Sequence, residues 1–355
     1  MFRDPGTRCT RCLMPATFPG IDFDAKGVCK LCRDYQKREL LGVDVLRARI
    51  RSRQGRQYDC IVGISGGKDS CYVAYLARRK FDLKVLAVCY DFPFLCDLAR
   101  TNMRSVCDSL GIELMVVKTK RNLEYNLLRN HLLSVGATGT SWGQCLFCHY
   151  GINAILYNVG IRRDIPWILG GVTKYEKWEC ESRSSLLLRR VRRSSVADKL
   201  RFGYYQAKSF AWLAEQRRQY PLPNAKWFDV YGETTLPGEG PQGLNVFDYV
   251  QWDQNVIEET LVKETGWVKP DKSISWRYDC SLEPFLDYTY KKEFGISTVG
   301  LYLSHQVRDG LIDRESSLKL ILEFEIEENL RERLDEVFDF LMIPESLRVQ
   351  FFSAA

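Results

Sequence analysis

Six consecutive residues near the start of the chain combine hydroxyl groups, glycines and a cation, a set that suits a bound phosphate chain. They are Ser65, Gly66, Gly67, Lys68, Asp69 and Ser70. They follow a short apolar run at 59–63 and open a helical segment. Adjacent glycines let the backbone approach a ligand without an intervening Cβ, and N–H groups at a helix N-terminus attract anions. The sequence therefore predicts a phosphate-binding turn between a strand and a helix.

This turn closely resembles the PP-loop of the N-type ATP pyrophosphatases, whose signature is SGGxDS. It does not fit the Walker pattern, because residue 61 is Ile and Asp69 follows Lys68. The resemblance implies an enzyme that splits ATP between its α and β phosphates and transfers AMP to a carbonyl or amide oxygen of a small-molecule acceptor. A sulfur or nitrogen nucleophile then displaces AMP. It also implies that Lys68 neutralises developing charge, that Asp69 helps to place magnesium, and that pyrophosphate is held by Ser65, Gly66, Gly67, Asp69 and Ser70.

Apolar and helical stretches alternate around this loop. The expected strands lie at 60–64, 85–90, 113–117 and 165–169, with helices near 70–80, 97–110, 121–134 and 150–160. The alternation predicts an α/β fold with a parallel, doubly wound sheet, and the resemblance implies its PP-loop or HUP-like adenine nucleotide hydrolase form. Because such sheets bind ligands beyond the carboxyl ends of their strands, nucleotide contacts are expected from Tyr90, Asp91, Gly170 and Gly171.

Two CxxC pairs near the N-terminus predict a metal site. Cys9, Cys12, Cys29 and Cys32 are four thiols in two tight turns, and four thiolates close the tetrahedral shell of a structural zinc ion. Such an ion would stabilise a segment that is too small to bury a core of its own. The alternative is four unrelated thiols.

A third CxxC pair, Cys145 and Cys148, lies before the fourth expected strand and so near the edge of the sheet that carries the glycine loop. PP-loop thiolases resemble this layout, and that resemblance implies a [4Fe-4S] cluster on these two thiols and one distant cysteine. Cys280 is the first candidate for that third ligand, and Cys180 is the second. A persulfide or redox pair on Cys145 and Cys148, or a second zinc site with His149, are alternatives.

The layout is also similar to the N-acetyl sugar amidotransferase family, on the text of residues 8–15 and 20–29 before the glycine loop. That resemblance implies ammonia from a partner glutaminase and conversion of an acetamido group on a nucleotide sugar to an amidine. Sulfur chemistry would instead need a cysteine desulfurase or sulfide as donor. Transfer of sulfur to tRNA is a less favoured acceptor chemistry, because the strongly basic run at 183–201 could bind RNA or nucleotide phosphates or form a solvated face. A third interpretation is a metal-binding adaptor whose PP-loop senses nucleotide without turnover.

The sequence predicts three parts. A zinc-ribbon or knuckle module spans 1–40, a PP-loop ATP-pyrophosphatase core spans 41–182, and a mainly helical region for substrate binding or oligomerisation spans 183–355. A linking helix is expected within 36–56, a glycine- and proline-rich loop at 232–243, and helices at 256–265 and 314–340. Lys174, Arg277 and Asp279 are candidates to face the acceptor, on charge and placement.

Composition sets the remaining expectations. A net charge of +6 suits an anionic substrate such as a nucleotide without requiring nucleic acid. No stretch approaches the roughly 20 apolar residues of a membrane span, and the N-terminus lacks an apolar signal core. Thirteen cysteines in a cytoplasmic protein indicate metal binding or catalysis more than disulfides. We expect a cytoplasmic homodimer with no membrane partner.

Overall fold

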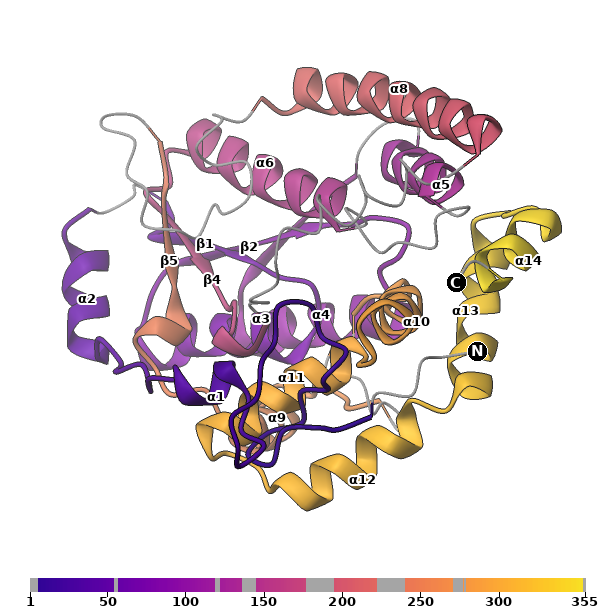
Figure 1. The fold of residues 1–355 in the computed structure, drawn as a ribbon. Coiled ribbons are helices and arrows are strands. Elements are labelled where there is room, and N and C mark those ends of the chain that lie inside the picture. The colour runs from indigo at the N-terminus through magenta and orange to yellow at the C-terminus, as the bar shows by residue number, and fades with distance from the viewer. Residues whose placement is uncertain are drawn as a thin grey trace.

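A five-stranded, wholly parallel sheet forms the centre of the molecule (Figure 1). The computed structural model describes residues 6–53, 57–118, 122–135, 145–176, 195–221, 240–270, 277 and 279–353. The strand order is β3-β2-β1-β4-β5. The strands are β1 (Cys60–Gly63), β2 (Val85–Tyr90), β3 (Glu113–Val117), β4 (Trp167–Gly170) and β5 (Gln242–Asn245). The predicted doubly wound parallel sheet is confirmed.

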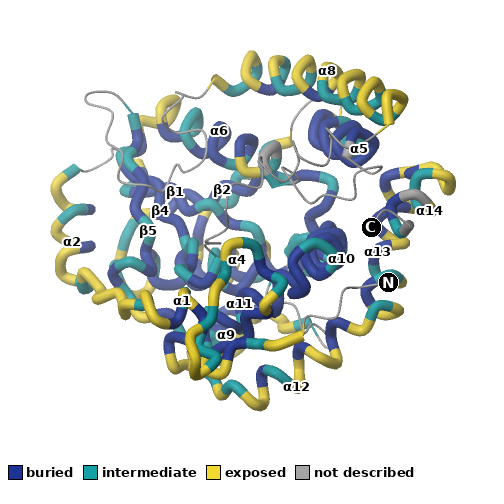
Figure 2. The backbone as a smooth tube through the Cα atoms, viewed as in Figure 1, coloured by how far each residue is buried: buried dark blue, intermediate teal, exposed yellow. Residues whose placement is uncertain are grey.

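How deeply each strand is buried depends on its position in the sheet and on the helices that pack against it. Every residue of β2 and β4 is buried, and their sequences VLAVCY and WILG are almost wholly apolar. Strand β3 lies at one edge of the sheet and is mostly half-buried. Continuous apolar runs are typical of parallel strands that have helices on both faces. Figure 2 shows that the sheet is largely buried, whereas the outer helices have exposed faces.

Helices cover both faces of the sheet (Figure 1). On one face lie α5, α6 and α8, and on the other lie α3, α4, α9, α10 and α11. The bounds are α2 (Val43–Arg51), α3 (Lys68–Tyr75), α4 (Asp97–Leu110), α5 (Leu123–Val135), α6 (Leu146–Arg163), α8 (Val196–Gln219), α9 (Gln254–Thr265), α10 (Glu283–Phe294) and α11 (Thr298–Asp309). A π-helical turn, η1 (Leu76–Lys80), extends α3, and the 3₁₀ turns η4 (Lys174–Glu176) and η6 (Val246–Asp248) follow β4 and β5.

Three local expectations are corrected. The linking helix is only α2, because Gly42 has φ +87° at its N-cap and residues 36–42 form no helix or strand. The stretch 314–340 forms two helices, α12 (Arg314–Phe324) and α13 (Glu327–Phe340). They separate where Glu325 turns inward to accept hydrogen bonds from Lys291 and from the backbone N–H of Ser297. Strand β5 begins within the predicted loop and pairs with β4.

The N-terminal segment packs on the C-terminal helices and shares one apolar cluster with them. Met14 and Phe18 pack with Phe294, Leu301 and Ile321 from α10, α11 and α12. The segment contains one short helix, α1 (Lys30–Arg33), and the chain ends in α14 (Glu345–Ser353). Within the described part of the chain, no helix is both long enough and apolar enough to span a bilayer.

Candidate active site

The glycine turn lies between β1 and α3, as predicted, and its backbone requires glycine. Gly66 has φ +83°, and a Cβ built on it would lie 2.0 Å from the carbonyl oxygen of Ala99. No side chain can be accommodated there, because the obstacle is backbone of α4. The carbonyl of Gly66 also accepts a hydrogen bond from Trp267 Nε1 at 3.0 Å. The turn is therefore fixed from two sides.

Two hydroxyls close the turn from within. Ser70 Oγ accepts a hydrogen bond from the backbone N–H of Ser65 at 3.1 Å and donates one to the carbonyl of Gly67 at 3.1 Å. Ser65 Oγ lies 3.1 Å from Ser70 Oγ. Gly67 is the N-cap of α3. The N–H groups of the first turn of α3 thus point out of a preorganised loop, which is the arrangement that binds phosphate at helix N-termini.

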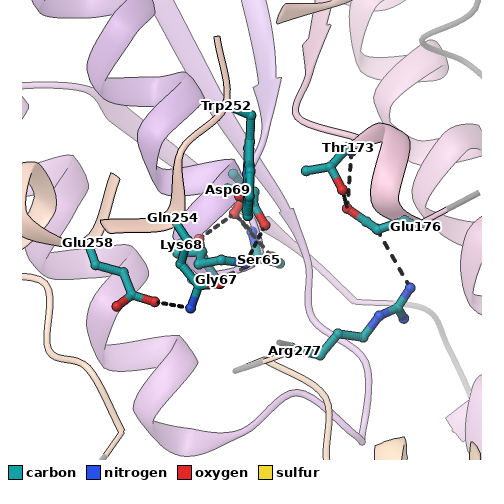
Figure 3. A network of polar contacts seen from close by, with 12 residues as sticks. Ser65, Gly67, Lys68, Asp69, Thr173, Glu176, Trp252, Gln254, Glu258 and Arg277 are labelled. Carbon is teal, nitrogen blue, oxygen red and sulfur yellow. Dashed lines mark hydrogen bonds and ion pairs between the residues drawn. The ribbon is translucent and has the colours of Figure 1, made fainter. Parts of the chain in front are cut away.

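Lys68 and Asp69 form a buried ion pair beneath an aromatic side chain (Figure 3). Lys68 Nζ lies 2.7 Å from Asp69 Oδ2, and its side chain is 1% exposed. Trp252 Nε1 donates to Asp69 Oδ1 at 2.7 Å, and the Trp252 ring lies 5.6 Å from Lys68 Nζ. Both carboxylate oxygens of Asp69 are therefore held in place. Contact of Lys68 or Asp69 with pyrophosphate or magnesium stays a prediction.

Two residues at the end of β2, Tyr90 and Asp91, were expected to contact the nucleotide, and their surroundings differ. Tyr90 is buried against Gly151 of α6, where a Cβ would lie 2.7 Å from its ring. Asp91 forms ion pairs of 2.9 Å with Arg100 and with Lys118. Burial alone would raise the pKa of Asp91, but these two cations hold it below its usual range.

The turn after β4 does contact the loop. Gly170 ends β4, and a Cβ on Gly171 would lie 3.1 Å from the carbonyl oxygen of Asp69 and 2.9 Å from Val73. Close packing of this turn against α3 therefore requires a glycine at residue 171.

Glu176 and Arg277 meet beside the loop (Figure 3). Glu176 Oε1 accepts from the backbone N–H and the hydroxyl of Thr173, both at 3.1 Å, and Oε2 lies 3.9 Å from Arg277 Nη2. Burial raises the pKa of Glu176, Arg277 opposes this, and the nearby Asp69 adds to it. Arg277 was a candidate on sequence, whereas Glu176 and Trp252 were missed. Glu176 follows a strand end by six residues, the only sequence signal it offers.

Cys280 is placed against the glycine loop by its neighbour. A Cβ on Gly67 would lie 3.3 Å from Asp279 Oδ2. The segment is fixed to the loop after β2, because Cys280 forms an antiparallel bridge with Leu95 and the carbonyl of Asp279 accepts from Cys96 N at 3.0 Å. Cys280 therefore lies next to the predicted phosphate site despite a separation of more than 200 residues in sequence.

Cys145, Cys148 and Cys280 lie close enough to interact electrostatically with one another and with Arg277. Their charges act on each other: Cys145 and Cys148 both raise the pKa of Cys280, after the larger effect of burial, and Arg277 lowers it. Burial raises the pKa of Cys148 as well, and Cys145 adds to this. All three side chains retain partial exposure.

The spacing of Cys145, Cys148 and Cys280 differs from that of ligands around a single metal ion. Among the described residues, only the N-terminal cysteines form a set of three or more metal-ligating groups whose ligand atoms all lie within 4.8 Å. A single zinc ion shared by Cys145, Cys148 and His149 therefore does not fit this arrangement. A [4Fe-4S] cluster on Cys145, Cys148 and Cys280 stays a prediction. Cys180, the second candidate, lies outside the described residues, as does most of the basic run at 183–201.

The four N-terminal thiols have the geometry of a closed tetrahedral site. Cys9 Sγ and Cys32 Sγ lie 3.8 Å apart, and Cys12 Sγ and Cys29 Sγ lie 3.7 Å apart. Bonds of about 2.3 Å to a tetrahedral zinc ion would separate the sulfurs by about 3.8 Å. Cys9 Sγ also accepts hydrogen bonds from three backbone N–H groups, including that of Cys29 at 3.2 Å. All four thiols are buried, as a structural ion requires.

Residues 41–129 match the family model of NAD synthase. An uncharacterized protein of Methanocaldococcus jannaschii, MJ1599, is 26% identical over 118 residues, which are 31% of this chain and 42% of that protein. The chain thus aligns with less than half of this relative's length.

Three solved structures resemble the fold at low sequence identity. NMN synthetase from Francisella tularensis has a TM-score of 0.41 at 14% identity, over 82% of this chain and 92% of that one. The U34-tRNA thiolase NcsA from Methanococcus maripaludis, with its [4Fe-4S] cluster, has a TM-score of 0.31 at 17% identity, over 88% and 87%. The NH3-dependent NAD synthetase from Campylobacter jejuni has a TM-score of 0.29 at 13% identity, over 65% and 95%.

The match of residues 41–129 agrees with the loop itself. The SGGKDS sequence lies at the carboxyl end of the central strand of a parallel sheet, with its glycine backbone preorganised at a helix N-terminus. Residues 41–129 are therefore similar to the NAD synthase family and contain the SGGxDS signature of the PP-loop ATP pyrophosphatases.

Proposed function

We propose that this protein is an ATP-dependent transferase that adenylates a carbonyl or amide oxygen of a small-molecule acceptor, releases pyrophosphate, and then replaces that oxygen with sulfur. The observation that carries the proposal is the position of Cys145, Cys148 and Cys280 around Arg277, next to the glycine loop. Displacement of AMP by nitrogen does not need thiols, whereas delivery of sulfur does.

In this proposal the loop performs the first half of the reaction. N–H groups of the turn at Gly67 bind the phosphates of ATP, and Asp69, oriented by Trp252 and Lys68, holds magnesium. Arg277 stays cationic, because the charges of Cys145, Glu176 and Asp279 outweigh its desolvation and raise its pKa. A cation there stabilises the negative charge that develops as the adenylated oxygen leaves.

The three thiols would act in the second half of the reaction, the transfer of sulfur. Cys145, Cys148 and Cys280 would hold a [4Fe-4S] cluster, and such a cluster would supply an iron with an open position for sulfide. The sulfide would be provided as such, or by thiol reduction of the persulfide of a cysteine desulfurase. The protein's own contribution is position: Cys280 is fixed beside Gly67 through Asp279, so the thiol group lies next to the site of adenylation. The four N-terminal cysteines would hold a structural zinc ion.

Glu176 favours a second candidate, an amidotransferase that uses ammonia from a partner glutaminase on the N-acetyl group of a nucleotide sugar. Its raised pKa and its place beside Asp69 and Arg277 suit a base that removes a proton from an attacking nitrogen. Transfer of sulfur to tRNA is a further alternative acceptor chemistry.

Metal content and nucleophile dependence distinguish the candidates. We expect anaerobically purified protein to be brown, with about four iron atoms per chain beyond the zinc, and to release pyrophosphate from ATP only with an acceptor. Colourless, iron-free protein that retains activity with ammonium would overturn sulfur transfer in favour of the amidotransferase. Failure to form pyrophosphate with any acceptor would contradict both.

A further inference from the structure

Helix α9 packs against α3 and α4, and a tryptophan lies two residues beyond each of its ends. Trp252, before the helix, binds the carboxylate of Asp69, whereas Trp267, after it, donates to the backbone carbonyl of Gly66. We propose that Trp267 is a positioning residue, which fixes the peptide between Gly66 and Gly67 so that the N–H of Gly67 faces the phosphates of ATP. This inference rests on the proposed binding of ATP at the glycine loop.

The peptide between Gly66 and Gly67 has little restraint of its own. Neither residue has a Cβ, so the peptide unit can rotate between them with a low steric barrier. A peptide unit is planar and trans, so the direction of the Gly66 carbonyl sets that of the Gly67 N–H, which points the opposite way. That N–H makes a long hydrogen bond of 3.4 Å to Ser65 Oγ, which a phosphate oxygen can replace. The direction of this donor therefore depends on the group that holds the carbonyl of Gly66.

Trp267 is itself held firmly by α4. Its side chain is 1% exposed. The next residue, Val268, is bound at both backbone groups by the Asn102 amide: Nδ2 donates to the carbonyl at 2.8 Å, and Oδ1 accepts from the N–H at 2.9 Å. Ser109 Oγ donates to the carbonyl of Thr265 at 3.0 Å. The same helix supplies the carbonyl that excludes a side chain from the glycine turn. A donor held this rigidly sets the orientation of its acceptor.

Trp167 is a matching tryptophan whose contacts are structural. It is 4% exposed, and its Nε1 donates to the carbonyls of Ile50 and Arg53, at the C-terminal end of α2, at 3.1 and 3.0 Å. Both indoles thus satisfy backbone carbonyls inside the protein, so loss of either N–H should lower stability to a similar extent. Of the two, Trp267 has its acceptor in the glycine loop. A comparison of the two residues therefore separates an effect on the loop from an effect on the fold.

The test uses the full-length, metal-loaded protein under reducing conditions with magnesium. Binding of α,β-methylene ATP and of AMP is measured by calorimetry for wild type, Trp267→Phe and the control Trp167→Phe, and melting temperatures are recorded. Phenylalanine keeps an aromatic ring and removes the donor, and AMP lacks the two phosphates assigned to the loop. Asn102→Ala keeps Trp267 but frees Val268, and it carries the same test if Trp267→Phe does not fold.

We expect Trp267→Phe to weaken binding of α,β-methylene ATP by about tenfold and that of AMP by less than about twofold, because one hydrogen bond to a charged phosphate is misdirected. Asn102→Ala should act in the same direction with a smaller factor. Trp167→Phe should lose a similar amount of thermal stability and keep both affinities. Unchanged affinity in Trp267→Phe, equal weakening of AMP, or equal weakening in Trp167→Phe would each overturn the role of Trp267 and leave the proposed function intact. Failure of wild type to bind the ATP analogue would overturn both.

Discussion

The two groups of cysteines differ in what their surroundings allow them to do. The N-terminal four are buried, lie at the separations of a tetrahedral shell, and are joined by backbone N–H groups that donate to Cys9 Sγ. Cys145, Cys148 and Cys280 are half-buried, come from two distant segments, and interact electrostatically with the cation Arg277. A closed, satisfied shell is suited to stability, whereas an open and incompletely satisfied one is suited to exchange of a ligand. In the proposed function, the same residue type would therefore mark a structural site in one region and a reactive site in the other.

Carboxylates near the two groups show the same contrast. Asp309, at the junction of the N-terminal module, accepts hydrogen bonds from Tyr35, Tyr175 and Lys174. These bonds outweigh the effect of burial and hold the pKa of Asp309 below its usual range. Glu176, in the reactive region, has a raised pKa. The negative charge of Asp309 is thus stabilised at this junction, whereas that of Glu176 is destabilised by burial beside the glycine loop.

Loss of an N-terminal thiol should have the largest effect on the whole molecule. In Cys29→Ser the four-thiol shell opens, and the apolar cluster shared with Phe294 and Ile321 loses its support. A structural zinc ion contributes of order 10 kcal/mol of binding energy to folding, so we expect aggregation or a much lower melting temperature. Elemental analysis should show the loss of one zinc per chain. A soluble variant with the melting temperature of wild type would show that this site does not stabilise the fold.

Loss of a thiol in the second group should affect transfer and leave the fold intact. Cys280→Ala should abolish transfer of the nucleophile, while release of pyrophosphate with acceptor largely survives, because the glycine loop is unchanged. Cys96→Ala is the matched control, since Cys96 is also half-buried and its backbone binds Asp279. Single-turnover assays and thermal denaturation measure the two outcomes. Equal loss of transfer in both variants would contradict a specific role for Cys280.

The fold could be predicted from the sequence much further than the site. Four of the five strands were expected near their observed bounds, because parallel strands buried on both faces have continuous apolar runs. Strand β5 was missed because QGLN is short and follows glycine and proline. The glycine loop was recognisable because its chemistry is contiguous. Trp252 and Glu176 join the site only through folding, and no local pattern marks them.

Asp309→Asn should lower stability by about 2–3 kcal/mol at pH 7, since an ionised acceptor of three hydrogen bonds is replaced by a neutral one. How the stabilisation by Asp309 changes with pH follows from its pKa, which is lower in the folded protein than in the unfolded chain. The contribution of Asp309 is present above the pKa of the unfolded chain and is lost as pH falls through the folded value. Urea denaturation of wild type and Asp309→Asn at several pH values should show that the difference in their free energies of unfolding becomes smaller in acid. A constant difference down to acid pH would mean that the charge of Asp309 is not what holds the junction.

Glu176→Gln should have the smallest effect on stability, and we expect it to stabilise the protein, whereas Asp309→Asn destabilises it. The raised pKa of Glu176 means that the folded protein binds its proton more tightly than the unfolded chain does. Its contribution to stability is therefore present below the unfolded pKa and is lost as pH rises through the folded value. Glutamine keeps an oxygen for the two bonds from Thr173 and removes the desolvated charge. We expect a stability gain of under about 1 kcal/mol at pH 7 that disappears near pH 4, measured by the same urea titrations. A loss of stability at pH 7 would show that Arg277 depends on Glu176 as a counter-ion, and the reactive region would then be as fully compensated as the junction at Asp309.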